Sequence, residues 1–291
     1  MSNRVAVVTG SNKGIGLEIV KNLCSKFDGT VILTARDERR GQDAVKKLNQ
    51  ENLHPVFHQL DVDNVESINS LASFIKTKYG GLDILVNNAG IVFQKDAKES
   101  FGVQAELTLK TNYFSLKKVC DTLYPLLRPH ARVVTLTSLA GHSHMIPDVD
   151  LRKKFCDPNL TEEALDALML EFIDAANDGS YLEKGWHGHP YFVSKVGASA
   201  LSRIHHQKFL KDPREDIVIN HVHPGWVDTD LTNHEGPLTV VEGAVAPTYA
   251  ALLPENCQSP KGDMIWFNKE ICDWVNGPIL WCHSSDRVLK K

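Results

Sequence analysis

The sequence lacks several features that would point to a membrane, a nucleic acid or a secreted protein. No uninterrupted apolar stretch is long enough to span a bilayer, so we expect no membrane association. Basic charge is not in excess: 32 lysines and arginines stand against 36 aspartates and glutamates, a net charge of −4, which argues against nucleic acid as a partner. The six cysteines show no Cys-x-x-Cys spacing, and the chain opens almost directly into an apolar strand, which leaves no room for a signal peptide. We therefore expect free thiols and a cytoplasmic protein.

The ligand spacing of a metal site is also missing. His142-x-His144, His205-His206 and His221-x-His223 are close pairs, but none is joined by the Cys, Asp or Glu spacing typical of zinc. Packed or solvated side chains are the plainer interpretation, although His223 stands beside a Pro-Gly turn and could face a pocket. No metal is expected.

What the chain does have is an alternation of short apolar strands and helical patterns over 291 residues, long enough for one α/β domain with a large core. This alternation predicts a doubly wound parallel sheet of the Rossmann type, with a ligand beyond the carboxyl ends of the strands. The expected strands lie near 5–9, 30–34, 55–60, 83–87, 132–137, 217–222 and 263–267.

A glycine turn follows the first of these strands. Gly10, Gly14 and Gly16 come directly after the run Val5–Thr9 and before a helical pattern. In such a turn Gly10 permits the tight bend, Gly14 lets the backbone approach a pyrophosphate, and Gly16 lets helix and strand pack closely. The free N–H groups and the positive end of the helix dipole would receive the phosphates.

Tyr191 and Lys195 stand four residues apart in a segment that reads as a helix, so they would share one face. A neighbouring ammonium group favours the phenolate, and we expect it to lower the pKa of Tyr191. A tyrosine tuned in this way can exchange a proton with a carbonyl or alcohol oxygen. The plain alternative for an isolated pair is a Tyr and a Lys packed on a surface helix.

Further motifs occur together with the glycine turn and the Tyr-Lys pair, in one fixed order. They are Asn87-Asn88-Ala89-Gly90, Asn112, Ser138 at a strand end, and Pro224-Gly225-Trp226-Val227-Asp228-Thr229. With all six elements, the chain resembles the short-chain dehydrogenase/reductase family, and within it the monomeric NADPH-dependent carbonyl reductases of animals. The resemblance runs from about Val5 to about Trp274, which predicts a single reductase domain over 1–274 and a C-terminal extension of unknown role over 275–291.

The resemblance implies roles for named residues. Tyr191 would act as the general acid, Ser138 would hold the substrate oxygen, Lys195 would serve Tyr191 and the nicotinamide ribose, and Asn112 would orient a water. Cofactor contacts are implied for Gly10, Asn12, Lys13, Gly14, Ile15, Arg36, Asp61, Val62, Asn88, Tyr191, Lys195, Pro224, Gly225, Trp226, Val227 and Thr229. Substrate contacts are implied for Phe93, Gln94, Lys95, Gln104, Ser138 and Trp226.

The residues after the second strand bear on the choice of cofactor. NAD-dependent relatives place an Asp there, whereas this chain has Ala35-Arg36. Because a guanidinium group matches a 2′-phosphate, we expect NADPH/NADP⁺, with Lys13 adding a second charge. The alternative is that Arg36 is solvated and Asp37 binds the ribose.

A long segment separates Ser138 from Tyr191, 53 positions further on. Thr161 can cap a helix there, and an apolar stripe follows at Leu165, Leu168, Met169, Phe172 and Ile173. The resemblance implies that this helical insertion, about 139–190, covers the face through which tetrameric relatives associate, so we expect a monomer. A lid or a surface decoration is the alternative.

The expected substrates are small carbonyl compounds: ketones, aldehydes and quinones, with glutathione conjugates left open as a further group. Two other functions stay open. One is a dedicated ketone reductase or alcohol dehydrogenase for a single metabolite such as a steroid or a prostaglandin. The other is a non-catalytic NADP(H)-sensing member of the fold.

Overall fold

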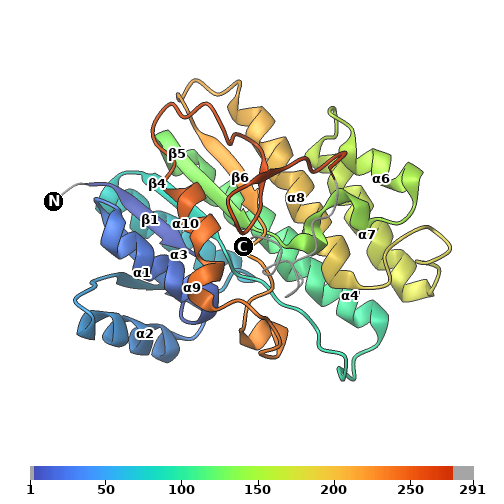
Figure 1. Ribbon diagram of the computed structural model, residues 1–291, viewed down its shortest axis with the longest axis horizontal. Helices are drawn as coiled ribbons and strands as arrows, with labels where there is room; N and C mark the ends of the chain where they lie inside the picture. Colours follow the sequence, from blue (N-terminus) through green and yellow to red (C-terminus); the bar gives the residue numbers. More distant parts are fainter. Residues whose placement is uncertain (1–2, 278–291) are drawn as a thin grey trace, which may run out of the picture.

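The eight strands of the computed structural model, which describes residues 3–277, form one sheet in the order β3-β2-β1-β4-β5-β6-β7-β8 (Figure 1). All neighbouring pairs are parallel except β7 and β8. The strands are β1 (Val5–Val8), β2 (Thr30–Ala35), β3 (Val56–Gln59), β4 (Leu82–Asn87), β5 (Leu127–Leu136), β6 (Val218–Val222), β7 (Met264–Ile265) and β8 (Ile271–Cys272). The predicted doubly wound α/β sheet is confirmed, with one short antiparallel strand, β8, that the sequence did not indicate.

Helices cover both faces of the sheet. They are α1 (Gly14–Lys26), α2 (Glu38–Gln50), α3 (Val65–Tyr79), α4 (Phe101–Leu109), α5 (Leu116–Leu123), α6 (Val149–Cys156), α7 (Glu162–Asp178), α8 (Pro190–Phe209), α9 (Val240–Gly243) and α10 (Val245–Ala251). Because side chains alternate across a strand, Val8 and Val86 face the core beneath α1 and α10, whereas Val7 and Leu85 face the core beneath α3 and α5. Strands buried on both faces explain the continuous β-branched runs. No described helix has the length and apolar character needed to cross a membrane.

The helical insertion forms a third core beside the sheet. In Figure 1, α6 and α7 lie to one side, next to α4 and α8. The Thr161 hydroxyl accepts a hydrogen bond from the Ala164 amide at 3.2 Å, as the expected cap, and Met169 and Phe172 of the predicted stripe are fully buried. A Cβ on Gly197 of α8 would lie 2.6 Å from the Met169 sulfur, so the two helices pack closely there.

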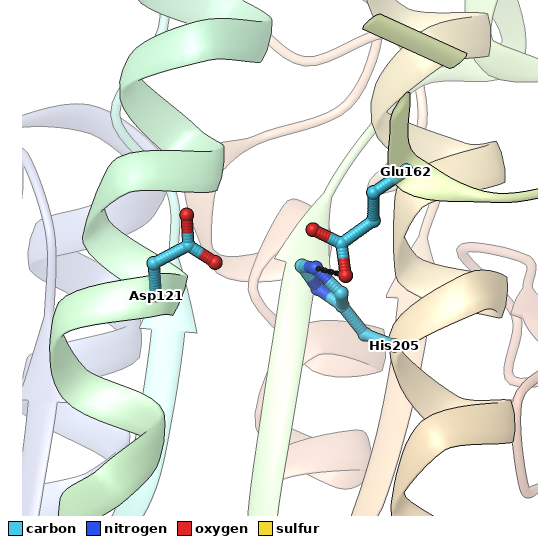
Figure 2. Close-up of side chains that lie close together, drawn as sticks. All are labelled: Asp121, Glu162 and His205. Atoms are coloured by element: carbon cyan, nitrogen blue, oxygen red, sulfur yellow. Dashed lines mark ion pairs between the residues drawn. The ribbon is translucent and has the colours of Figure 1, made fainter. Parts of the chain in front are cut away.

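Polar side chains continue this packing at the edge of the insertion. Figure 2 shows Asp121 of α5, Glu162 of α7 and His205 of α8 pointing toward one another, with ligand atoms within 4.8 Å. Glu162 also pairs with Lys208, and its second oxygen lies 3.7 Å from the Lys117 ammonium. The His205 imidazole, 3.5 Å from a Glu162 oxygen, and the Lys208 ammonium lower the pKa of Glu162 to about 2. Two ammonium groups already neutralise Glu162, so we interpret the group as an ion-pair clamp that fastens α7 to α5 and α8.

The end of the chain lies mostly outside the described residues. Of the extension at 275–291, only 275–277 are described. Five cysteines are described, and all are free thiols, whereas Cys282 lies outside the described part.

Candidate active site

The glycine turn sits where β1 ends and α1 begins. Gly10 and Gly14 have φ values of +59° and +58°, in the left-handed region that favours glycine. A Cβ on Gly10 would lie 3.1 Å from Ala89, and one on Gly16 would lie 2.5 Å from the Asn88 amide nitrogen. Gly16 therefore makes room for the Asn88 side chain and the Ser11 backbone, rather than only for close packing of helix and strand.

Asn88 braces this turn. Its side-chain amide donates to the carbonyls of Thr9 and Gly10, both at 2.9 Å. The Thr9 hydroxyl in turn accepts from the amides of Asn88 and Ala89 at 3.0 Å. The ends of β1 and β4 are thus tied together, so the Asn88 side chain holds the shape of the turn whether or not it also contacts a cofactor.

The start of α1 is open to an anion. No side chain caps this helix, and no acidic residue stands in its first turn. Uncapped N–H groups at a helix start, next to glycines without Cβ atoms, form a cradle that fits a phosphate. Among the residues predicted for this contact, Asn12, Gly14 and Ile15 are half-buried and Lys13 is exposed. This cradle is the structural feature that fits a dinucleotide.

The loop after β6 closes over the cradle from the opposite side. Thr229 lies against Gly14, since a Cβ on that glycine would be 3.6 Å from its methyl group. Lys13 forms an ion pair with Asp230, and the Gln94 side chain donates to the Leu231 carbonyl at 3.1 Å. The loop is therefore fastened both to the glycine turn and to the segment after β4.

Other residues predicted to contact the cofactor or the substrate lie in this loop, in the segment after β4 and in α4. Pro224 and Val227 are buried, Gly225 has φ +91°, and Trp226 is 46% exposed. Phe93 is half-buried and Lys95 exposed. Gln104 donates to the Glu99 carbonyl at 2.8 Å, which ties it to the start of α4.

At the end of β2, the adjacent residues Arg36 and Asp37 differ in whether their side chains form a hydrogen bond. Asp37 caps α2 by accepting from the Arg40 amide at 2.8 Å. Arg36 is exposed, and among the described residues its guanidinium group has no hydrogen bond or ion pair. Further along, Asp61 accepts from the Asp63 amide at 3.0 Å, and Val62 is half-buried. The Arg36 guanidinium group, unpaired among the described residues, is therefore the group at this strand end that would suit a 2′-phosphate.

Ser138, Tyr191 and Lys195 come together where β5 ends and α8 begins. Ser138 follows β5, accepts from the Ala140 amide at 3.2 Å and hydrogen-bonds the Tyr191 phenol. Tyr191 is the second residue of α8, whose start is capped by His189. The Lys195 ammonium lies 5.6 Å from the Tyr191 ring centre and donates to the Leu136 carbonyl at 2.9 Å.

The pKa of Tyr191 moves in the direction opposite to the sequence-based expectation. Burial raises it to about 12, and the Ser138 hydrogen bond offsets only part of this. Burial also lowers the pKa of Lys195 to about 8. Desolvation disfavours the charged form of each group, and the ammonium points at the Leu136 carbonyl instead of the phenol oxygen. The expectation that Lys195 lowers the Tyr191 pKa is therefore wrong for this structure, in which Tyr191 is a protonated acid at neutral pH.

Asn112 lies in a π-helical turn, Lys110–Ser115, between α4 and α5. Its side chain accepts from the Ile91 amide at 2.8 Å, and donates to the Ile91 carbonyl at 2.9 Å and the Ser194 hydroxyl at 3.1 Å. A Cβ on Gly90 would lie 3.2 Å from the Asn112 side-chain oxygen and 3.5 Å from the Lys195 ammonium. The π-turn, a feature common at functional sites, thus places the Asn112 side chain next to Gly90, which the Lys195 ammonium of α8 also approaches.

Known proteins are similar to this chain in sequence. A family profile described as "short chain dehydrogenase" matches residues 4–147. Carbonyl reductase [NADPH] 3 of Rattus norvegicus is 46% identical over 265 residues, covering 90% of this chain and 96% of that protein. The chain belongs to the short-chain dehydrogenase/reductase family. Carbonyl reductase [NADPH] 1 of Homo sapiens is 44% identical over 272 residues, covering 93% of this chain and 98% of that protein.

Solved structures show the same fold. Salutaridine reductase from Papaver somniferum superposes with a TM-score of 0.81 at 34% identity, over 90% of this chain and 99% of that one. Menthone neomenthol reductase from Mentha piperita superposes with a TM-score of 0.77 at 33% identity, over 92% of this chain and 99% of that one. An NADPH-bound carbonyl reductase from chicken fatty liver superposes with a TM-score of 0.65 at 22% identity, over 92% of this chain and 98% of that one. At this identity the likeness concerns the fold alone.

Proposed function

We propose that this protein is an NADPH-dependent carbonyl reductase, an oxidoreductase that converts C=O groups into CH–OH. Its family membership and the NADPH-dependent carbonyl reductases among its relatives support this class of enzyme and this cofactor. The observation that carries the proposal is the meeting of Ser138, Tyr191 and Lys195 at the carboxyl ends of the strands, beside a cradle that fits a dinucleotide.

The residues that would hold NADPH follow from the cradle. The glycine turn and the uncapped start of α1 would bind the pyrophosphate, and Arg36, with Lys13, would bind the 2′-phosphate. The Pro224–Thr229 loop would cover the nicotinamide end. When bound, NADPH supplies the hydride.

Tyr191 would deliver the proton to the substrate oxygen. Its phenol is protonated because burial raises its pKa to about 12. The Ser138 hydroxyl, already hydrogen-bonded to the phenol, would donate to the same oxygen and stabilise its developing negative charge. Lys195 would supply positive charge as the phenol gives up its proton, and Asn112 would link Lys195 to solvent through a water.

Turnover of purified protein tests this proposal. We expect NADPH-dependent reduction of a quinone, an aromatic ketone and an aliphatic aldehyde, and a loss of about 10²–10⁴-fold in kcat for Tyr191→Phe. Substrates are proposed to enter past Phe93, Lys95 and the exposed Trp226, and glutathione conjugates belong in the same panel. Absence of turnover with every carbonyl would contradict the proposal.

One observation favours a second function. Two solved structures with more than 30% identity are named for a reductase of one metabolite, salutaridine or menthone. A dedicated ketone reductase would show kcat/KM for one ketone far above that for the quinone and the aldehyde. A non-catalytic role is disfavoured because Asn112, Ser138, Tyr191 and Lys195 are all present.

We also propose that the protein is monomeric and cytoplasmic. The proposal of a monomer is based on α7. This helix buries its apolar stripe against α4 and α8 and so covers the face next to α8, which carries Tyr191 and Lys195. The location rests on the five described free thiols. Sedimentation at micromolar concentration tests the first, and fractionation of cells tests the second.

A further inference from the structure

His223 is the residue that joins the two loops of the active site. It follows β6 and continues the pairing with β7, since its amide donates to the Ile265 carbonyl at 2.9 Å. The side chain is 3% exposed, and its ring packs edge-on against Trp266 with 4.6 Å between centres. The pairing of its backbone with β7 and the packing of its ring against Trp266 thus fix the position of the His223 imidazole.

One ring nitrogen of His223 accepts two backbone amides from different segments. Its Nδ1 lies 2.9 Å from the Leu139 nitrogen and 3.3 Å from the Gly225 nitrogen. Leu139 directly follows Ser138, and Gly225 lies in the loop that would cover the nicotinamide. The parallel pairing of Leu136 with Val222 brings these two segments side by side.

This arrangement requires one form of the imidazole. Nδ1 can accept only when it carries no proton, so the ring is neutral with its proton on Nε2. Burial lowers the pKa of His223 to about 3, which keeps that form at all physiological pH values.

We propose that His223 is a positioning residue for the reaction: its Nδ1 holds the Ser138–Leu139 turn and the Pro224–Gly225 turn at a fixed separation. The inference rests on the proposed reductase function and deepens it. Ser138 binds the reacting oxygen and the Gly225 loop binds the cofactor, so their separation decides how the carbonyl meets the hydride donor. Small displacements of this kind are costly in rate.

The test compares three variants that differ in where they place an acceptor. In His223→Asn, the side-chain oxygen can occupy the place of Nδ1. In His223→Gln, the oxygen falls near the place of Nε2, away from both amides. His223→Leu has no acceptor. His221→Leu is the matched control, because His221 is buried two residues earlier on the same strand face and neither of its ring nitrogens has a hydrogen-bond partner among the described residues.

Steady-state kinetics with NADPH and a carbonyl substrate are measured together with the amide ¹H–¹⁵N shifts and hydrogen exchange of Leu139 and Gly225. We expect kcat/KM to fall about 10- to 100-fold in His223→Leu and His223→Gln, mostly in kcat, and to recover to within about 3-fold of the parent in His223→Asn. The two amides should exchange faster in the Leu and Gln variants only. His221→Leu should keep the parent kinetics and both amide signals.

Several results would overturn the inference. One is full kcat/KM in His223→Leu; another is an equal loss in the Asn, Gln and Leu variants, which would indicate a merely structural role. If His223→Leu does not fold, the Asn–Gln pair decides alone. If the parent protein reduces no carbonyl, the proposed function fails, while the two amide signals still show whether His223 holds both turns.

Discussion

The Asp37 carboxylate accepts the Arg40 amide at 2.8 Å and so closes the first turn of α2, while the neighbouring Arg36 guanidinium stays exposed and unbound by described residues. The cap uses one oxygen of Asp37 and leaves the Arg36 guanidinium group without a partner among the described residues. Because a free guanidinium group matches a 2′-phosphate, the pair of residues favours phosphate binding by Arg36 over ribose binding by Asp37.

The first prediction concerns this cation. Arg36→Asp should lower kcat/KM with NADPH about 10- to 100-fold, because charge-assisted hydrogen bonds to the phosphate are lost, and should leave NADH unchanged or improved. Initial rates with both cofactors measure it. Arg39→Asp, at an exposed position in the first turn of α2, serves as the charge-matched control. Equal kcat/KM for both cofactors in the parent protein would mean that Arg36 does not discriminate between NADPH and NADH through the 2′-phosphate.

The second prediction concerns Asp230, which neutralises Lys13 across the entrance of the cradle. Asp230→Asn should release this ammonium group for phosphate and lower the Kd for NADPH about 2- to 5-fold, a small effect because the pair is exposed. Lys13→Gln should raise the Kd instead. Fluorescence titration at low and high salt measures both, and the difference should shrink with salt. A higher Kd for Asp230→Asn would show that the ion pair holds the loop in its binding form.

The third prediction is the pH dependence of reduction. The pKa of Lys195 is lowered to about 8, so its ammonium form is lost as the pH rises through that value. Since that positive charge supports proton donation by Tyr191, kcat/KM for reduction should fall above about pH 8. Lys195→Arg, which stays charged, should move the decline upward even if its overall rate is lower. A decline at the same pH in both proteins would assign it to another group.

Sequence patterns predicted the features that depend on periodicity. The stripe from Leu165 to Ile173 and the cap at Thr161 predicted α7, because helix spacing and capping chemistry are local. The partners of Asn112 and the double acceptor at His223 were not predictable, since both depend on segments far apart in the chain. The direction of the Tyr191 pKa was mispredicted for the same reason: burial is a property of the folded site, and here it raises the pKa while the Lys195 ammonium donates to the Leu136 carbonyl.

The fourth prediction tests the ion-pair clamp of α7. Glu162→Gln takes the buried carboxylate away from Lys208, whereas Lys117 keeps its ion pair with Asp166. The change should lower the free energy of unfolding by about 1–3 kcal/mol, less than for a fully buried pair because Lys208 is largely exposed. Asp150→Asn, which breaks an exposed pair with Lys153 in the same insertion, should have no measurable effect. Urea unfolding measures both. Equal stability of the Glu162→Gln variant would show that apolar packing alone holds the insertion.

The last prediction concerns acid stability. Burial lowers the pKa of His142 to about 4 and those of His221 and His223 to about 3, against an ordinary value of 6.5. Between about pH 6.5 and 4 the unfolded chain therefore binds more protons than the folded protein, so stability falls as the pH falls. Each such histidine contributes a slope approaching about 1.4 kcal/mol per pH unit.

His221 offers the cleanest test of this slope, because burial, Arg203 and His142 all disfavour its charged form. Within residues 3–277, its ring nitrogens have no hydrogen-bond partner. His221→Leu should keep the stability measured at pH 7.5 and lose less of it at pH 5 than the parent protein does. The carboxylates with depressed pKa values, such as Glu162 at about 2, contribute mainly below about pH 5, so the histidines dominate the window from 6.5 to 5. Urea unfolding at pH 7.5, 6 and 5 compares the two proteins, and identical losses would mean that His221 does not titrate on unfolding in this range.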